Sequence, residues 1–277
     1  MINKIICDSI IIEALKEDMP FGDITTDSII GEESQSEAVL IAKEDGIVAG
    51  LDIAARVFEI VDTKTVFIKM ACEGEKVKSG DLIAKIQGKT ASLLKSERVA
   101  LNFLQHLSGI ATKTNKLSNL VADLPTSVSD TRKTLPGLRM FEKYAVKVGG
   151  GSNHRFSLSD GVLIKDNHIK AAGSIKTAVE AARKNIPHTV KIEVETESMD
   201  QVNEALEAGA DIIMLDNMSP DMMREACNII GKRAITEASG NIDETNIRAK
   251  ALSGVNILSV GAITHSVKAF DISMKFR

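Results

Sequence analysis

The chain has 277 residues, of which 44% are apolar and 26% are charged, and its formal net charge at pH 7 is −4. This composition is typical of a globular protein with a sizeable core, in one large domain or two unequal ones. The slightly acidic balance excludes a global attraction to nucleic acid or to an anionic membrane surface, so we expect neither partner. Charged side chains are spread among the apolar residues of positions 1–20, which argues against a signal peptide or a membrane span.

The three cysteines, Cys7, Cys72 and Cys227, stand at no paired or metal-binding spacing. An odd and scattered set argues against a disulfide framework and favours a reducing compartment. We therefore expect a cytoplasmic protein.

The first part of the chain consists of short β-type runs interrupted by glycine, at 38–42, 47–49, 66–70 and 82–86, with a helical pattern at 52–60. Residues 73–82 resemble the turn-and-strand pattern of lipoyl and biotinyl carrier domains, but show no clear equivalent of their modifiable lysine, so we interpret them as local β-sandwich geometry. A long amphipathic segment follows at 91–109. The pattern predicts a smaller N-terminal α/β sandwich domain with a bridging helix over residues 1–110.

The second part alternates strand and helix patterns, which is typical of parallel strands joined by right-handed helical crossovers. Strands are predicted at 127–130, 161–165, 190–195, 211–216, 234–238 and 257–260. Helices are predicted at 139–148, 175–184, 199–208, 221–230 and 244–252. Because no G-x-G-x-x-G motif follows any strand, we expect an α/β barrel, TIM-like and either closed or open, over residues 111–265. The segment 266–277 is predicted to return to the N-terminal domain.

The carboxyl ends of the strands of such barrels carry the reacting groups. Every predicted end here has charged or phosphate-binding residue types, at 130–133, 165–168, 193–195, 216–217, 237–241 and 259–262. The stretch 130–170 also contains eight lysines and arginines against four acidic residues. Lys143 and Lys147 fit a solvated helix face, being four residues apart. The remaining cations indicate a site for an anion.

Two loops after the last strands are predicted to bind phosphate. One contains Ser239, Gly240 and Asn241, and the other contains Ser259 and Gly261. Each places glycine before a helix, where free backbone N–H groups bind anions. A third loop, the glycine-rich stretch 149–155, ends in His154 and Arg155, which are predicted ligand contacts.

Two carboxylates, Glu193 and Asp216, end neighbouring predicted strands. They are predicted to converge on Mg²⁺ or on sugar hydroxyls, although each could instead pair with a cation across the mouth of the barrel. No histidine and cysteine cluster has zinc-ligand spacing, and no serine lies in a G-x-S-x-G motif. Zinc chemistry and serine-hydrolase chemistry are therefore not expected.

A set of motifs over almost the whole chain resembles the quinolinate phosphoribosyltransferase family. The motifs are EDMPFGDIT at 17–25, ERVALN at 97–102, TRKT at 131–134, PGLR at 136–139, GGGSNHR at 149–155, KDNH at 165–168, LDNM at 215–218, ASGN at 238–241 and SVG at 259–261. The resemblance implies transfer of a phosphoribosyl group from phosphoribosyl pyrophosphate to quinolinate with decarboxylation, giving nicotinate mononucleotide.

The resemblance also implies a role for each site residue. Arg132, His154, Arg155 and Lys165 would surround the pyridine dicarboxylate, with Arg98 reaching it from the neighbouring subunit of a homodimer. Lys133, Glu193 and Asp216 would act on the ribose, the pyrophosphate and its Mg²⁺, while the loops with Ser239 and Ser259 would hold the 5-phosphate. Arginine suits carboxylates because its planar guanidinium binds them bidentately.

Three alternative functions stay open at this point. A transport-associated subgroup shares the fold and many of the motifs. The segment 73–82 could belong to a carrier scaffold, and Lys165 could form a Schiff base in a barrel lyase.

Overall fold

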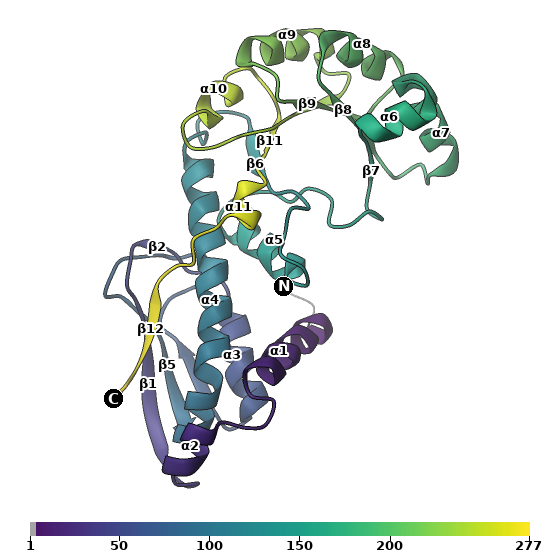
Figure 1. Cartoon of the computed structure of the whole chain (residues 1–277). Coiled ribbons are helices and arrows are strands. Elements are labelled where there is room, and N and C mark those ends of the chain that lie inside the picture. Colours follow the sequence, from purple (N-terminus) through teal and green to yellow (C-terminus); the bar gives the residue numbers. More distant parts are fainter. Residues whose placement is uncertain (1–3) are drawn as a thin grey trace. The chain divides into compact units, whose positions relative to one another are not determined.

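The structure, a computed structural model, describes residues 4–277, whose contacts divide the chain into two compact units (Figure 1). Unit 1 contains the residues up to Asn115, Leu135–Gly150 and Ser266–Arg277, and unit 2 contains Lys116–Thr134 and Gly151–His265. The predicted boundary at residue 110 lies inside a continuous helix, and the predicted domains stay a sequence-based prediction. None of the helices in the described part of the chain has both the length and the apolar composition that a bilayer span requires.

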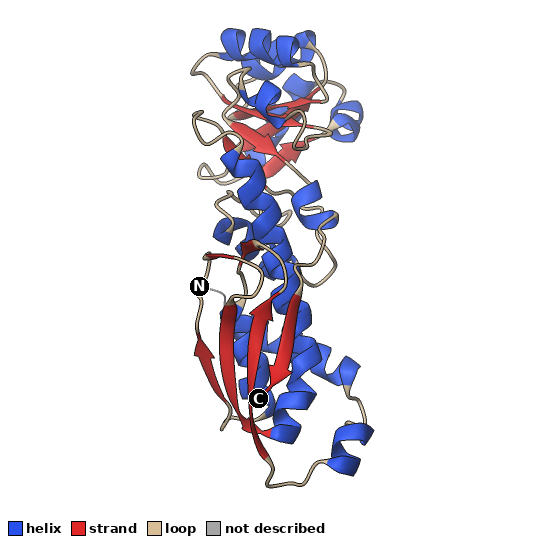
Figure 2. Ribbon diagram, turned by 90° about the vertical axis from the view of Figure 1, so that its left-hand side faces the viewer, coloured by secondary structure: helices blue, strands red, loops and turns tan. Residues whose placement is uncertain are grey.

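Unit 1 is built on a four-stranded antiparallel sheet in the order β12, β1, β5, β3 (Figure 2). Its strands are β1 (Gln35–Ala42), β3 (Val66–Lys69), β5 (Leu82–Lys89) and β12 (Ile272–Phe276), and β2 (Gly46–Ile47) pairs separately with β4 (Lys76–Val77). Strand β12, from the end of the chain, lies beside β1, with Ala42 opposite Ile272. The prediction of a smaller N-terminal sheet domain is confirmed.

Several helices belong to unit 1 together with this sheet. They are α1 (Lys4–Asp18), α2 (Ile24–Ile29), α3 (Leu51–Val61), the long α4 (Thr90–Asn119), which continues into unit 2, and α5 (Arg139–Val148). Helix α5 has the predicted bounds, but the prediction that Lys143 lies on a solvated face is wrong, because Lys143 is fully buried. Helix α5 buries Glu142 and Lys143 as well as the apolar Phe141, Ala145 and Val146, so it is enclosed on more than one side.

Unit 2 contains a six-stranded parallel sheet in the order β6, β11, β10, β9, β8, β7. Its strands are β6 (Ser127–Ser129), β7 (Val162–Ile164), β8 (Ile192–Thr196), β9 (Ile212–Asp216), β10 (Ile235–Ser239) and β11 (Ile257–Ser259). Strands β6 and β7 form the two ends of this row, so the barrel is open. The predicted α/β fold with a TIM-like parallel sheet is confirmed in its open form.

The helices that follow these strands are α6 (Asp166–Ala172), α7 (Ile175–Asn185), α8 (Met199–Glu207), α9 (Pro220–Ile230), α10 (Ile247–Ala251) and α11 (Ala262–His265). Of these, α7, α8, α9 and α10 lie on the outer side of the curved sheet (Figure 1). Ser174, Ser198 and Ser219 begin α7, α8 and α9, and each accepts a hydrogen bond from a backbone N–H of the first turn. Such N-caps satisfy donors that the helix itself leaves free, which explains where the helices start.

The strand register of unit 2 places the polar residues of several strands on one face. Glu195 lies opposite Met214, Met214 opposite Glu237, and Asp216 opposite Ser239. Residues opposite each other in a parallel pair project to the same side, and side chains alternate along each strand. Leu163, Glu193 and Ser259 belong to the same face through their own pairs. The sheet therefore gathers carboxylates and hydroxyls on one surface.

Candidate functional site

A pocket of about 490 Å³ opens in unit 2, on the face that carries these polar residues. Its lining brings together ten predicted site residues: Arg132, Lys133, His154, Arg155, Lys165, Asp216, Ser239, Gly240, Asn241 and Ser259. They come from the loops after β6, β7 and β10, from the ends of β9, β10 and β11 and from the segment between α5 and β7. The carboxyl ends of the strands thus meet at one pocket, as the barrel pattern predicts.

One side of the pocket is strongly cationic. The Nε atoms of Arg132 and Arg155 are buried and have no hydrogen-bond partner among the described residues, while Nη1 of Arg155 donates to the carbonyl of Gly161 (2.8 Å). Burial, and next the charge of Arg132, lower the pKa of Arg155. Unsatisfied buried donors and facing like charges are both unfavourable, so this arrangement fits an anionic ligand. Lys165, at the same pocket, forms an ion pair with Glu195.

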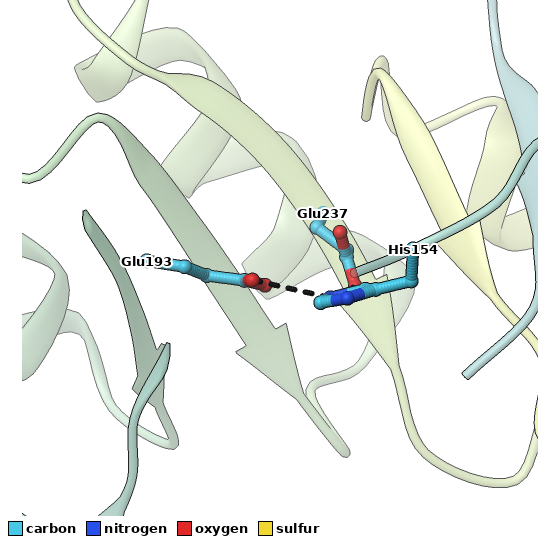
Figure 3. Close-up of side chains that lie close together, drawn as sticks. All are labelled: His154, Glu193 and Glu237. Atoms are coloured by element: carbon cyan, nitrogen blue, oxygen red, sulfur yellow. Dashed lines mark ion pairs between the residues drawn. The ribbon is translucent and has the colours of Figure 1, made fainter. Parts of the chain in front are cut away.

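Below these cations, His154 meets two buried glutamates from β8 and β10 (Figure 3). Its Nε2 lies 3.1 Å from Oε2 of Glu193 and 3.4 Å from Oε1 of Glu237. On the other side of the ring, the backbone N–H of Arg155 donates to Nδ1 (2.7 Å), and the backbone N–H of His154 donates to Asp130 (2.9 Å). The ring is therefore held at both nitrogens by the protein.

The cluster of His154, Glu193 and Glu237 binds a proton that isolated groups would release. Burial opposes a charge on the ring, yet the hydrogen bonds and charges of Glu193 and Glu237 raise the pKa of His154 to about 10. Burial likewise raises the pKa of Glu193. Because the Arg155 N–H points at Nδ1, the shared proton lies on the Nε2 side, between the ring and the carboxylates.

The same geometry speaks against a metal ion at this cluster, although its three ligand atoms lie within 4.8 Å of one another. A neutral histidine that binds a metal through Nε2 carries its proton on Nδ1. Here Nδ1 accepts a hydrogen bond and has no room for that proton. Glu193 is only 4% exposed and is engaged with His154, whereas Asp216 lines the pocket. The two carboxylates that were predicted to converge on Mg²⁺ or on sugar hydroxyls thus have different surroundings, since Glu193 is buried against His154 and Asp216 lines the pocket.

The loop after β10 has an unusual backbone conformation. Gly240 has φ +91°, and Asn241 and Asn217 also have positive φ, at 49° and 53°. A Cβ on Gly240 would lie 2.1 Å from Oδ1 of Asn217, so only glycine fits there. Asn241 donates from its side chain to Oδ1 of Asn217 (3.2 Å), which joins this loop to the one after β9.

The prediction that the loop after β11 binds phosphate through backbone N–H groups stays a prediction. The hydroxyl of Ser259 is buried and donates to Glu237. A Cβ on Gly261 would lie 2.9 Å from Cδ of Lys133, so glycine allows this lysine to pass closely. Arg98 lies on α4 in unit 1 and is exposed. Its predicted role in a neighbouring subunit stays a prediction.

Two glutamates of the site lie in the predicted strand-end stretches 193–195 and 237–241 but were given no role in the sequence-based prediction. Glu195 pairs with Lys165, and Glu237 contacts His154 and Ser259. The sequence did contain a signal for both, since each is two positions from a predicted site residue, Glu193 and Ser239, and a strand projects every second side chain to the same face.

Comparison with known proteins identifies the family. The model of the N-terminal domain of quinolinate phosphoribosyl transferase matches residues 23–108, and the model of its C-terminal domain matches residues 110–275. The chain belongs to the quinolinate phosphoribosyltransferase family. The family resemblance seen in the sequence motifs is thereby confirmed.

Individual relatives of this quinolinate phosphoribosyltransferase family member match over nearly its full length. A probable nicotinate-nucleotide pyrophosphorylase (carboxylating) of Bacillus subtilis is 48% identical over 93% of this chain and 89% of its own. Among solved structures, NadC from Streptococcus pyogenes is 45% identical with a TM-score of 0.96, covering 99% of this chain and 97% of that one. The nicotinate-nucleotide pyrophosphorylase from Francisella tularensis is 41% identical, also with a TM-score of 0.96, covering 100% and 98%.

Proposed function

We propose that this chain transfers the phosphoribosyl group of phosphoribosyl pyrophosphate to quinolinate, releasing pyrophosphate and carbon dioxide and leaving nicotinate mononucleotide. The reaction belongs to NAD biosynthesis. The observation that carries the proposal is that one pocket combines two half-buried arginines, whose buried Nε atoms have no partner among the described residues, with a glycine loop at the end of a parallel strand. The arginines suit adjacent carboxylates, and the glycine loop suits a phosphate group.

The pyridine dicarboxylate would bind at the cationic side of the pocket. Arg132 and Arg155 supply buried guanidinium donors, and Lys165 adds a third cation at the same lining. Planar guanidinium groups match carboxylate oxygens bidentately. His154 supports this surface by accepting the Arg155 backbone N–H at its ring.

The phosphoribosyl donor would bind along the ends of β9 and β10. The 5-phosphate would occupy the loop of Ser239, Gly240 and Asn241, Asp216 would face the ribose, and the exposed amine of Lys133 would meet the pyrophosphate. These contacts would hold the ring nitrogen of quinolinate in line with the ribose C1, which is the main contribution that positioning makes to rate.

The chemistry then needs charge stabilisation more than covalent participation. As the bond between C1 and the pyrophosphate oxygen breaks, positive character develops at C1, which the carboxylate of Asp216 and the negative charge of the nearby glutamate cluster offset. The ring nitrogen forms the new bond to C1 and becomes cationic. The adjacent carboxylate leaves as carbon dioxide, its bonding electrons stay on the ring carbon next to this nitrogen, and that carbon takes up a proton.

Magnesium is proposed as the cofactor. When bound, it would neutralise charge on the pyrophosphate oxygens. Asp216 lines the pocket with a carboxylate of the kind that Mg²⁺ accepts, of which Oδ2 accepts a hydrogen bond from Nδ2 of Asn217 (2.8 Å), while Glu193 is directed at His154. This donor set supports Mg²⁺ held through one protein carboxylate and the substrate oxygens, a common arrangement for this ion. Glu193 would act on the ribose side through its charge.

The proposal includes a cytoplasmic homodimer in which Arg98 completes the site of the neighbouring subunit. The exposed position of this arginine on α4 supports a role outside its own unit. A guanidinium from the neighbour would add to the cations that bind the dicarboxylate.

The deciding experiment is incubation with quinolinate, phosphoribosyl pyrophosphate and Mg²⁺, followed by chromatography of the products. We expect nicotinate mononucleotide and pyrophosphate in equal amounts. Absence of turnover with tight quinolinate binding would instead favour the transport-associated subgroup. The amine of Lys165 is paired with Glu195, and no observation favours a Schiff-base lyase.

A further inference from the structure

Two consecutive carbonyl groups of the predicted phosphate loop are held by side chains of the next helical segment. Nζ of Lys250 donates to the carbonyl of Gly240 (2.5 Å), and Nδ2 of Asn246 donates to the carbonyl of Asn241 (2.7 Å). Asn246 is the N-cap residue of α10, and Lys250 lies four positions later, so the two side chains project from the same face of this short helix. Neither residue stood out in the sequence.

The direction of these carbonyls fixes the direction of two backbone donors. In a planar trans peptide the C=O and the following N–H point in opposite directions. Carbonyls that turn toward Lys250 and Asn246 therefore turn the N–H groups of Asn241 and Ile242 away from α10. The loop lines the pocket, and consecutive N–H groups on one side of such a turn form an anion-binding concavity.

The setting of Lys250 fits a positioning role. The residue is only 8% exposed, and its burial lowers the pKa of the amine, while the charges of Asp216 and Asp243 oppose that shift. A lysine in such a place is more costly than an apolar residue of similar volume. It supplies in return a strong donor to a loop whose Gly240 and Asn241 both have positive φ.

We propose that Lys250 and Asn246 are positioning residues that turn the N–H groups of the 239–242 loop toward the phosphate of the phosphoribosyl donor. This inference rests on the proposed function, because it assigns the phosphate to that loop. The two residues act on phosphate binding through the loop carbonyls, from outside the pocket lining.

The test uses Lys250→Met, which keeps the volume and removes the donor. In calorimetric titration with ribose 5-phosphate as the probe, we expect the Kd to rise about tenfold, the scale of one lost hydrogen bond from a charged donor. Phthalate, which probes the Arg132 and Arg155 side, should bind as it does to the wild type. In the complete assay, KM for phosphoribosyl pyrophosphate should rise while KM for quinolinate stays the same.

A thermal melt separates positioning from a purely structural role. Replacing the buried charge by an apolar side chain should leave the Tm unchanged or higher. Arg248→Met is the matched control. It also removes a cation from this helix, but this cation pairs with Asp123 and not with the 239–242 loop. Asn246→Ala should also weaken ribose 5-phosphate binding, through the neighbouring carbonyl.

A lower Tm with unchanged ribose 5-phosphate affinity would overturn the inference, and so would a wild-type protein that does not bind this probe. The proposed function fails on a different result, namely the absence of nicotinate mononucleotide from the wild-type assay. The titrations with ribose 5-phosphate decide the role of Lys250 in either case.

Discussion

His154 shows how one side chain can serve several neighbours at the residue scale. Its ring accepts the N–H of Arg155 on one side and faces Glu193 and Glu237 on the other. Two buried carboxylates without a proton or a cation would be strongly unfavourable. A residue that the sequence identified as a ligand contact thus also offsets part of the negative charge of these two carboxylates.

This balance predicts how stability depends on pH. The pKa of His154 is raised to about 10 by the two glutamates, above the value of about 6.5 for an unfolded chain. A raised pKa contributes stability that is fully present below pH 6.5 or so and is lost as the pH rises toward about 10. We expect His154→Gln to be less stable than the wild type at pH 7 and to show a flatter dependence between these limits. Urea unfolding at a series of pH values measures this.

The exposed His188 provides the control for that series. His188→Gln should reproduce the wild-type dependence, because its ring has no buried carboxylates to balance. Parallel curves for the wild type and His154→Gln would contradict the shared-proton interpretation.

The arginine pair predicts which acid the pocket selects. Burial, and next the charge of Arg132, lower the pKa of Arg155, and a ligand with two adjacent carboxylates offsets the two positive charges better than one with a single carboxylate. Phthalate should therefore bind and inhibit, and nicotinate should bind at least about tenfold more weakly than quinolinate. Calorimetry with the three acids tests the order.

Arg155→Met should remove most of this preference. Arg224→Met, on the exposed surface of α9 where the arginine pairs with Asp221, should leave it intact. Nicotinate that binds as tightly as quinolinate and reacts at a similar rate would place the protein among non-decarboxylating transferases.

At the scale of elements, the loops after β9 and β10 are interlocked by close packing. A Cβ at Gly240 would overlap Asn217, and φ of +91° adds strain of about 1–2 kcal/mol for any other residue. Gly173→Ala meets the same strain at φ +94° with nothing within 4 Å of the new Cβ. Both variants should melt at lower temperature, but Gly240→Ala more so, and Gly240→Ala alone should lose ribose 5-phosphate affinity. Equal effects of the two on melting and binding would exclude the packing argument.

Most elements of unit 2 were predictable because each strand and helix has its own periodic pattern. The predicted helix 175–184 differs from α7 by one residue, and the six parallel strands were found within a few residues. Helix α6 was missed, since its first residues, Asp166 to His168, resemble a strand-end loop and α6 has no buried residue to create a hydrophobic stripe. Helix α1 was also missed, as its apolar residues do not gather on one face.

Contacts between distant elements were less predictable than the elements. Alternation along a strand predicts that Glu193 and Glu237 lie on the inner face. It does not predict that His154, from another loop, approaches them to 3.1 Å and 3.4 Å. Likewise, no local pattern distinguishes the buried Lys250 from the exposed Lys232. Such distances depend on sheet register and on burial, which arise only when the strands pair.

At the scale of the whole molecule, the two units are each made from separate stretches of chain. Strand β12 joins the edge of the sheet that begins with β1, and α5 belongs to unit 1 although both its neighbouring segments belong to unit 2. Strand β12 at the end of the chain pairs with β1 near its beginning, so unit 1 combines the two ends of the sequence. The folding of the last residues and that of the first strand therefore depend on each other.

The proposed homodimer predicts that two inactive variants restore each other. Arg98 lies in unit 1 and Lys133 lies at the pocket of unit 2, so a neighbour's Arg98 and a subunit's own Lys133 can come from different chains. A dimer of one Arg98→Ala chain and one Lys133→Ala chain then has one site with both native residues. After random exchange of equal amounts, about a quarter of wild-type activity should return. Mass spectrometry of the intact dimers checks the exchange. If mixed dimers form and stay inactive, Arg98 serves the site of its own subunit.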